Sequence, residues 1–505
     1  MVFTGANDER NQVHRHVLSK SRYTDGLQCA KRLWLGLHEP HLATPPDQAQ
    51  QAVFDTGNRV GEIARLRWPS GVLVDELYWD HEGAVTNTKK LLADASTEVI
   101  FEAGFTELDV RIRSDVMIRV PDTQLWDLVE VKSSTSPKPQ YDDDIAIQAL
   151  VIETAGVRLR KKMVLVIDNS YVFDGAALDL QKYFSLHDRT AAVTAKEQTT
   201  RESLDRFHKV ANGDVPDIEP SPHCRQPYLC SFWDYCTAEV PKNWIMELPR
   251  IGAKTVAELR SQGVESIRDV PSRFPLTDQQ AKVRTAVITD DEWVSPELNS
   301  VLIDESPANH FLDFETFNPG IPIYEGTRPY EKIPFQWSCH SKTDQGAIDH
   351  TEFLASPASD PRRAFAESLI AHIGVSGSVV VYSSFEKGVL TALENQFPDL
   401  GDELRAIKER LWDLLEVVRN NYYHPEFHGS YSIKAVLPAL VPELAYDDLA
   451  LQAGDSASVS FQNLVLDKTL DDDDKNRIES ELKSYCARDT LAMFKILGRL
   501  TSISA

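Results

Sequence analysis

The chain has 505 residues, which predicts roughly three domains at about 150 residues per domain. Hydrophobic residues make up 42% and charged residues 26%, an ordinary globular balance that excludes wholesale disorder. The 53 basic and 77 acidic residues give a net charge of -24, which argues against a protein that coats nucleic acid by bulk attraction but allows an enzyme with a local basic groove. Because the sequence has neither a run of 18 apolar residues nor an apolar leader, we expect a soluble, cytoplasmic protein with no membrane partner.

The first part of the chain mixes helix-like and strand-like patterns. Apolar residues spaced three and four apart predict a helix over residues 23–37, and a second helix is expected over 57–66. An amphipathic helix is expected over 144–154. Strands are expected over 98–101, 116–120, 125–132 and 163–167. Together these elements predict a mixed α/β domain.

The composition changes twice farther along the chain. Residues 216–243 are rich in proline and cysteine, and a short helical module is expected over 244–290. The polar stretch 295–309 is typical of a linker, and a new α/β pattern begins at 310 and continues to the last residue. We therefore expect three parts, over residues 1–243, 244–300 and 301–505.

A first group of polar residues lies on two predicted strands. The apolar segment 126–132 carries Glu130 and Lys132 on one face, because strand side chains alternate. Asp115 is expected at the head of another strand. Two carboxylates that meet across neighbouring strands can hold a hard divalent cation, and a nearby lysine can orient water or stabilise the charge on a phosphate. A plain ion pair on a strand surface is the alternative.

This pattern resembles the PD-(D/E)XK nuclease superfamily, in which an Asp is followed at a distance by Glu-x-Lys. The resemblance implies a restriction-endonuclease-like fold, with Asp115 and Glu130 as Mg²⁺ or Mn²⁺ ligands. It also implies Lys132 as the catalytic base or charge stabiliser. Gln148 matches the additional motif of the RecB-like branch, and Glu62 matches the acidic ligand on the family's first helix.

The cysteines form a second group. Cys224, Cys230 and Cys236 fall within 13 of the 505 residues, and six cysteines in all are too few for a secreted disulfide scaffold. The two gaps of five residues fit zinc poorly, since structural zinc sites use tight cysteine pairs. A cluster of three thiolates needs a fourth, and Cys29, in the predicted first helix, is the natural candidate.

This layout of one early cysteine and three after a nuclease core resembles the iron–sulfur nucleases of the RecB-like group, of the CRISPR-adaptation and AddB type. The resemblance implies that these four cysteines hold a [4Fe-4S] cluster that ties the start of the domain to its end. Zinc and unliganded cysteines remain the alternatives. Cys339 and Cys486 lie in apolar patterns and are expected to be buried core thiols.

Carboxylates recur in three segments of the last part of the chain. Asp313 and Glu315 lie at i and i+2 of a predicted strand, and therefore on one face. Glu386 follows a second predicted strand, and Tyr485 and Asp489 lie at i and i+4 on one helix face. Four carboxylates that converge from these segments could hold two cations about 3.5–4 Å apart, an arrangement that activates water and grips a scissile phosphate.

This constellation resembles the DnaQ-like DEDD exonucleases, which have an RNase H-like fold, in the subgroup with a tyrosine before the last Asp. The resemblance implies that the four carboxylates are metal ligands and that Tyr485 orients the attacking water. At the second motif the family has Asp, whereas this chain has Glu386, with one more methylene group. Asp413 is a candidate auxiliary acid or a structural residue. An inactive RNase H-like fold used only for binding is the alternative.

Basic and glycine-containing segments are candidates for nucleic-acid contacts. The segment 248–259 resembles a helix-hairpin-helix motif, in which a Gly-x-Gly turn and a helix N-terminus bind phosphate. The resemblance implies contacts from Gly252 and Lys254, with Arg250 in place of the first glycine, and a helical spacer that does not bind is the alternative.

Two further segments leave the same choice open. The run of cations between residues 158 and 162 could grip a phosphate backbone or form a solvated face. It consists of Arg158, Arg160, Lys161 and Lys162. The tyrosines of segment 422–431, which lie close to Lys434, could stack on bases or pack in the core.

Taken together, the resemblances predict an enzyme with two nuclease sites that hydrolyses phosphodiester bonds of DNA, most simply an exonuclease, in repair or defence. The expected partner is single-stranded DNA or duplex ends, and RNA stays open. One alternative is a single active PD-(D/E)XK site beside an RNase H-like half that only binds nucleic acid. Another, from a different class, is a non-enzymatic iron–sulfur scaffold.

Overall fold

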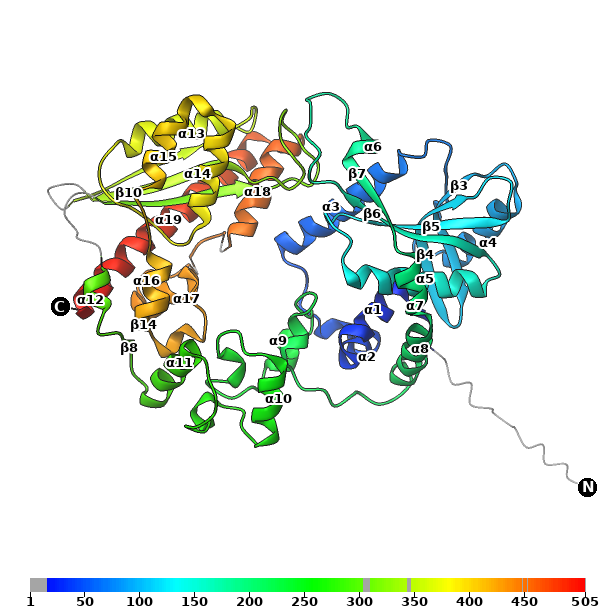
Figure 1. The fold of residues 1–505 in the computed structure, drawn as a ribbon, viewed down its shortest axis with the longest axis horizontal. Helices are drawn as coiled ribbons and strands as arrows, with labels where there is room; N and C mark the ends of the chain where they lie inside the picture. The colour runs from blue at the N-terminus through cyan, green and yellow to red at the C-terminus, as the bar shows by residue number, and fades with distance from the viewer. Residues whose placement is uncertain (1–15, 303–308, 343–346, 447, 452, 505) are drawn as a thin grey trace, which may run out of the picture. The chain divides into compact units, whose positions relative to one another are not determined.

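The computed structural model describes residues 16–302, 309–342, 347–446, 448–451 and 453–504 (Figure 1). The chain forms two compact units. The first unit consists of the described residues up to Pro46, Val53–Tyr171 and Ala176–Ala238. The second unit consists of Asp47–Ala52, Val172–Gly175 and the described residues from Glu239 onward, so the predicted helical module lies within it.

A seven-stranded mixed sheet forms the centre of the first unit, with the strand order β2-β3-β4-β5-β6-β7 and with β1 paired to β4. Neighbours among β3, β4 and β5 are antiparallel, β5 and β6 are parallel, and β7 is antiparallel to β6. The strands are β1 (Leu18–Ser19), β2 (Val72–Leu73), β3 (Val99–Glu107), β4 (Val110–Arg119), β5 (Leu125–Lys132), β6 (Arg158–Ile167) and β7 (Phe184–Asp188).

Helix α5 (Pro139–Thr154) connects the two parallel strands and lies inside the core of the first unit. Residues 145–152 of this helix are buried on every side, because α5 packs on the sheet and is itself covered by other helices. The remaining helices of this part of the chain are α1 (Lys20–Gln28), α2 (Ala30–His38), η1 (Pro40–Leu42), α3 (Gln48–Arg65), α4 (His81–Ala93), α6 (Leu180–Tyr183), α7 (Thr190–Ala195), α8 (Glu197–Ala211), η2 (Pro222–Arg225) and α9 (Trp233–Thr237).

The predicted helix over 23–37 is wrong in one respect, because the structure has two helices there. Cys29 separates α1 from α2 with an extended backbone, φ -160° and ψ 125°. Its N–H still bonds to the carbonyl of Asp25, and its carbonyl accepts from Leu33, so the break leaves both groups satisfied. Hydrophobic periodicity does not reveal a break of one residue, since apolar spacing continues through it.

Other boundaries of the first unit also differ from prediction. Strand β4 begins at Val110, so Asp115 lies in its middle and not at its head. Strand β6 begins at Arg158, and the basic run therefore belongs to a strand. Helix α5 begins at Pro139, which places residues 142–144 within the helix. In each case charged side chains interrupt the apolar pattern, although the backbone continues the element.

The second unit contains a five-stranded sheet with the order β11-β10-β9-β12-β13 and a two-stranded sheet of β14 and β8. Strand β10 is antiparallel to both β9 and β11, whereas β12 is parallel to β9 and to β13. The strands are β8 (Trp293–Val294), β9 (His310–Phe317), β10 (Ile333–Lys342), β11 (Ile348–Leu354), β12 (Val379–Val381), β13 (Leu411–Asp413) and β14 (Tyr422–Tyr423).

Helices cover both faces of the five-stranded sheet (Figure 1). Leu312 and Phe314 of β9 point to the face that packs on α13, α14 and α15. Asp313 and Glu315 therefore point to the other face, where α18 and α19 contact β9. These helices are α13 (Arg362–Ile373), α14 (Phe385–Gln396), α15 (Gly401–Lys408), α18 (Gly454–Leu466) and α19 (Asp472–Ser504).

Shorter helices complete the second unit. The predicted module 244–290 is helical, with η3 (Ile245–Glu247), α10 (Ala253–Ser261), η4 (Ile267–Asp269) and α11 (Asp278–Thr289). The predicted linker over 295–309 is partly wrong, because it contains a short helix, and its residues 303–308 lie outside the described part of the chain. The remaining helices are α12 (Leu298–Val301), η5 (Pro398–Leu400), α16 (Leu414–Asn421), η6 (Pro425–Phe427) and α17 (Ile433–Leu440).

The longest described helix is α19, with 33 residues, and it carries charged side chains along its length. Within the described ranges, none of the helices combines the length and the apolar character needed to cross a bilayer.

Candidate functional site

Asp115 and Glu130 lie side by side on antiparallel strands of the first unit. The register of β4 and β5 pairs Val116 with Val129, which places Asp115 next to Glu130. The N–H of Val131 donates to Oδ2 of Asp115 at 2.6 Å. We call Asp115, Glu130 and Lys132 the Glu130 site.

Glu130 is the centre of this site, and its carboxylate is almost fully buried. The ammonium groups of Lys132 and Lys20 both lie 2.8 Å from its Oε1 atom. Gln148, buried on α5, donates from Nε2 to Oε2 of Glu130 at 2.6 Å. Lys132 also pairs with Asp144 of α5 at 2.5 Å. The structure thus brings Gln148, predicted from its motif, directly to the carboxylate of the Glu-x-Lys pair.

The charges of the Glu130 site shift the pKa values of its members in opposite directions. Burial, followed by the charge of Glu130, raises the pKa of Asp115 to about 7. Burial alone would raise the pKa of Glu130, but Lys132 and Lys20 outweigh it and hold that pKa below its usual range. Burial would lower the pKa of Lys132, but Glu130 and Asp144 raise it. Lys132 therefore keeps its proton, which favours charge stabilisation over general-base work.

Other carboxylates lie around Asp115, in a cavity of about 440 Å³. Glu62 on α3, which the resemblance implied as a metal ligand, lines this cavity, and its half-exposed side chain pairs with Arg59 at 2.8 Å. Glu102 was not predicted. The pairing of β3 with β4 places it opposite Asp115, with a left-handed backbone, φ 56°, that is rare for a residue other than glycine. Burial raises the pKa of Glu102.

The four predicted cysteines gather in the first unit. Cys29, Cys224, Cys230 and Cys236 line one small cavity, together with Lys31, Arg32 and His223. Cys224 and Cys230 lie in a small apolar core with Leu35 and Phe232. We call Cys29, Cys224, Cys230 and Cys236 the four-cysteine cluster. The prediction that Cys29 lies in a helix is wrong, since it lies at the break between α1 and α2.

The spacing of the four thiols bears on what they can hold. Zinc with bonds of about 2.3 Å to tetrahedral thiolates brings their sulfurs to within about 4 Å of one another. Among the described residues, no three of these sulfurs lie within 4.8 Å of one another. Burial raises the pKa of Cys224, Cys230 and Cys236, and the charges of neighbouring thiolates add to it. Binding of one zinc ion would therefore require these thiols to move closer together.

A cavity of about 450 Å³ in the second unit holds the other predicted group. Asp313 and Glu315 reach it from β9, Glu386 from the first turn of α14, and Tyr485 and Asp489 from α19. We call these five residues the Asp313 site. Segments more than 170 residues apart in sequence, such as those of Asp313 and Cys486, meet here.

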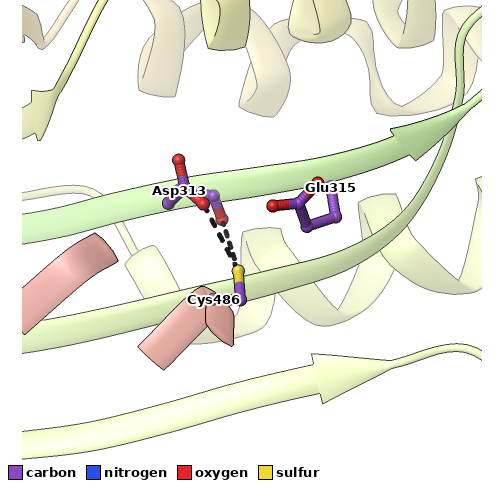
Figure 2. A group of neighbouring side chains, drawn as sticks. All are labelled: Asp313, Glu315 and Cys486. Atoms are coloured by element: carbon purple, nitrogen blue, oxygen red, sulfur yellow. Dashed lines mark hydrogen bonds between the residues drawn. The ribbon is translucent and has the colours of Figure 1, made fainter. Parts of the chain in front are cut away.

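Cys486 and Tyr446 each contact a carboxylate of the Asp313 site, and the sequence did not predict either contact. Cys486 was expected to be a core thiol; it is buried, but it lies beside the carboxylates and donates to Oδ2 of Asp313 at 3.4 Å. Figure 2 shows its thiol facing Asp313, with Glu315 two residues along the same strand. The hydroxyl of Tyr446 donates to Oδ1 of Asp489. Only the position of Cys486 next to Tyr485 could have signalled its place.

Crowding of buried acids dominates the electrostatics of the Asp313 site. Burial, followed by the charge of Asp489, raises the pKa of both Asp313 and Glu315 well above the usual range. Burial raises the pKa of Glu386 to about 8 and that of Asp489 to about 6. Lys434, whose ammonium lies 4.9 Å from the ring centre of Tyr485, lowers the pKa of the acids it faces.

These residues fit divalent cations. The ligand atoms of Asp313, Glu315 and Cys486 lie within 4.8 Å of one another, the one such group of three in the described part of the chain. Oε2 of Glu386 is buried and has no hydrogen-bond partner among the described residues. Hard cations prefer carboxylate oxygens, so Mg²⁺ or Mn²⁺ would relieve both the repulsion and the unpaired oxygen.

Asp413 and the tyrosines of segment 422–431 have structural roles. Asp413 caps α16, where its Oδ1 accepts from the N–H groups of Leu415 and Glu416. For the tyrosines of segment 422–431 the core-packing alternative is confirmed, because Tyr422, Tyr423 and Tyr431 are buried. They pack with Phe427, and aromatic rings in such a core present no free face.

The segment that resembles a helix-hairpin-helix motif has a left-handed residue just before helix α10. Arg250 stands where the motif has its first glycine, yet it adopts a left-handed φ of 53°. Gly252 then caps α10, and Lys254 lies in the first turn of that helix. The substitution therefore keeps a glycine-like turn at the cost of some backbone strain.

The basic run of β6 pairs with acidic neighbours. Arg160 pairs with Asp127 at 2.5 Å. Lys161 lies 3.6 Å from Asp188, and Lys162, mostly buried, lies 3.0 Å from Glu153. Arg158 is exposed at the start of the strand. These ion pairs reduce the positive charge that the run offers to a phosphate backbone, which favours the solvated-face alternative.

The comparisons with known proteins give sequence similarities, and the matched descriptions name no activity. Residues 310–432 match a domain of unknown function, DUF2779. That range contains Asp313, Glu315 and Glu386 but ends before α19. The uncharacterized protein MG366 of Mycoplasma genitalium is 27% identical over 209 residues, which cover 37% of this chain and 31% of that protein. The chain thus spans about a third of the length of this relative, and any function rests on the geometry above.

Proposed function

We propose that the protein is a divalent-metal-dependent nuclease that hydrolyses phosphodiester bonds of DNA, with one site in each unit. The observation that carries the proposal is the Asp313 site. Four carboxylates from three distant segments meet a tyrosine in one cavity, and one of their buried oxygens has no partner in the described residues. Such crowding is costly unless cations occupy the site.

The sheet of the second unit supports an RNase H-like assignment. Its three antiparallel strands β9, β10 and β11 are followed by two strands parallel to β9, in the order β11-β10-β9-β12-β13. Strand β9 is central and carries Asp313 and Glu315, as the DEDD resemblance implies. Glu386 reaches the same cavity despite its extra methylene group, because it lies in the first turn of α14.

The residues of the Asp313 site have distinct tasks in the proposed reaction. Two bound cations would activate a water and stabilise the leaving oxygen. Asp313, Glu315, Glu386 and Asp489 would hold them. Burial and the charge of Asp489 raise the pKa of the Tyr485 hydroxyl, so it keeps its proton and can orient a water by donating to it. The hydroxyl of Tyr446 holds the Asp489 carboxylate in place.

The Glu130 site supports a PD-(D/E)XK assignment for the first unit. Asp115 and Glu130 would hold a cation, which supplies Lewis-acid stabilisation of a phosphate. Gln148 orients the carboxylate of Glu130, and Lys132 offers a protonated ammonium to developing negative charge. Glu62 and Glu102 are further carboxylates on the same cavity.

The four-cysteine cluster supports a [4Fe-4S] assignment, with a structural role. The four thiols would join the start of the first unit to residues 224–236 at its end. Lys31 and Arg32 supply positive charge beside the thiolates, which suits an anionic cluster. Anaerobically purified protein is expected to absorb near 400 nm and to lose that absorbance in Cys230→Ser; a colourless protein with bound zinc would contradict the assignment.

A digestion panel tests the nuclease proposal and its alternatives. End-labelled single- and double-stranded DNA and RNA are incubated with Mg²⁺ or with chelator, using wild type, Asp313→Asn, Lys132→Met and the double variant. We expect each single variant to keep part of the metal-dependent cleavage and the double variant to lose it. If only Lys132→Met lowers cleavage, the second unit merely binds nucleic acid. If wild type leaves every substrate intact, the scaffold alternative holds.

A further inference from the structure

Glu130 accepts hydrogen bonds from two lysines at the same oxygen. The Nζ atoms of Lys20 and Lys132 each lie 2.8 Å from Oε1, and the two side chains are 23% and 22% exposed. Lys132 comes from the Glu-x-Lys motif on β5, whereas Lys20 opens helix α1, 110 residues before Glu130. The motif accounts for the first lysine and leaves the second without a role.

The charge of the site suggests what a second lysine does. Glu102, Asp115, Glu130 and Asp144 are four carboxylates around the two ammonium groups of Lys20 and Lys132. A divalent cation held by Asp115 and Glu130 would balance the charge of this group. Without Lys20 the same group would keep one net negative charge, which repels a phosphodiester. The cation would also compete with both ammonium groups for Glu130, which leaves Lys20 available to a phosphate oxygen.

Helix α1 connects Lys20 to the four-cysteine cluster. The helix begins at Lys20 and ends at Gln28, directly before Cys29. Nε2 of Gln28 donates to the carbonyls of Tyr228 at 2.8 Å and His223 at 3.2 Å, so the end of the helix is held by the loop that carries the other cysteines. A helix of nine residues is stiff, and movement at its Cys29 end displaces Lys20.

We propose that Lys20 is a substrate-binding residue of the Glu130 site, which contacts a phosphate oxygen of the DNA backbone, and that the four-cysteine cluster positions it through α1. This inference rests on the proposed nuclease function of the first unit. It assigns the cluster a defined task. A group bound by Cys29 fixes one end of α1, and Lys20 at the other end of α1 contacts the substrate.

The first test separates binding from chemistry. Lys20→Met, Lys132→Met and the control Lys89→Met, an exposed lysine on α4, are made in the Asp313→Asn background, so that cleavage reports the first unit. A charge-assisted hydrogen bond to phosphate predicts a KM about 10-fold higher for Lys20→Met, with kcat within about twofold of the parent. Lys132→Met is expected to lose kcat, and Lys89→Met to match the parent.

Two results would overturn the role of Lys20. One is an unchanged KM in Lys20→Met, and the other is a loss of kcat in Lys20→Met well beyond twofold. Lys20→Arg keeps the charge and is expected to restore most of the affinity, while a thermal melt of each variant checks its fold. Should Lys20→Met fail to fold, Lys20→Gln is measured in its place against the same two criteria.

The second test follows helix α1 itself. Amide hydrogen exchange of residues 20–28 is compared in wild type and Cys230→Ser, along with KM for Cys230→Ser and for the double variant with Lys20→Met. We expect faster exchange in α1 of Cys230→Ser, and a double variant whose KM equals that of Lys20→Met. Unchanged exchange, or additive losses, would refute coupling through α1. Because exchange needs no cleavage, this readout separates a failure of the coupling from a failure of the nuclease proposal.

Discussion

Glu102 is a residue whose backbone, more than its side-chain type, makes it a candidate member of the Glu130 site. It adopts a φ of 56° in the middle of strand β3, where neighbouring residues are extended, and it lies opposite Asp115. A left-handed conformation costs a residue with a Cβ atom about 1 kcal/mol or more. Such strain persists where the surroundings impose it, and here it aims a third carboxylate at the cavity of the Glu130 site.

Substitution at Glu102 separates strain from function. Glycine tolerates a positive φ, whereas alanine does not, so we expect Glu102→Gly to be more stable than Glu102→Ala by about 1 kcal/mol in urea denaturation. Both variants remove the carboxylate, and Mn²⁺ binding by the first unit should weaken equally in both. Equal stability of the two variants would show that the conformation is relaxed.

At the scale of elements, helix α5 links the Glu130 site to the rest of the first unit. Three consecutive aspartates near its start pair with different cations. Asp142 is buried and makes two hydrogen bonds with Arg189, at 2.8 and 2.6 Å. Asp143 is more exposed and pairs with Lys196, while Asp144 supports Lys132. These pairs, and not only the helix dipole, explain the acidic run.

The ion pairs of Asp142 and Asp143 make a matched comparison. Asp142→Asn leaves Arg189 facing an uncharged partner in a mostly buried place, which should lower the free energy of unfolding by about 2 kcal/mol. Asp143→Asn removes a half-exposed pair and should cost less than about 1 kcal/mol. Urea denaturation of both variants measures the difference. If Asp143→Asn were the more damaging change, the pairing would not be the source of the stability.

Helix α19 positions the Asp313 site by its periodicity. Tyr485 and Asp489 are one turn apart and both reach the cavity, as the i and i+4 spacing predicted. Cys486 lies between them in sequence and faces Asp313 of β9. The helix therefore presents a three-residue surface to the strand, although the motif identifies two of its members.

At the scale of the whole molecule, the sequence predicted what regular periodicity and local motifs encode. Glu130 and Lys132 on one strand face, and Asp313 and Glu315 on another, follow from the two-residue repeat of a strand, and the structure has both pairs in these places. Gln148 followed from a motif on the next helix, and the structure adds its hydrogen bond to Glu130.

What the sequence could not predict depends on tertiary packing. Lys20 and Tyr446 join their sites only because distant segments meet, and no local pattern marks them. The break at Cys29 and the left-handed turn at Arg250 are backbone events at single residues, where composition continues unchanged. For the tyrosines of segment 422–431 the sequence left base stacking and core packing open, because burial is not visible in a short polar segment.

The central claim is that acidic side chains from separate segments hold divalent cations, and it is tested most directly by a crystal of the protein soaked in Mn²⁺. Anomalous difference density is expected in the cavity of the Asp313 site, within bonding distance of Asp313, Glu315, Glu386 and Asp489, and beside Asp115 and Glu130 in the first unit. Asp313→Asn should lose the density in the second unit alone. Density absent from both cavities at saturating Mn²⁺ would contradict the account.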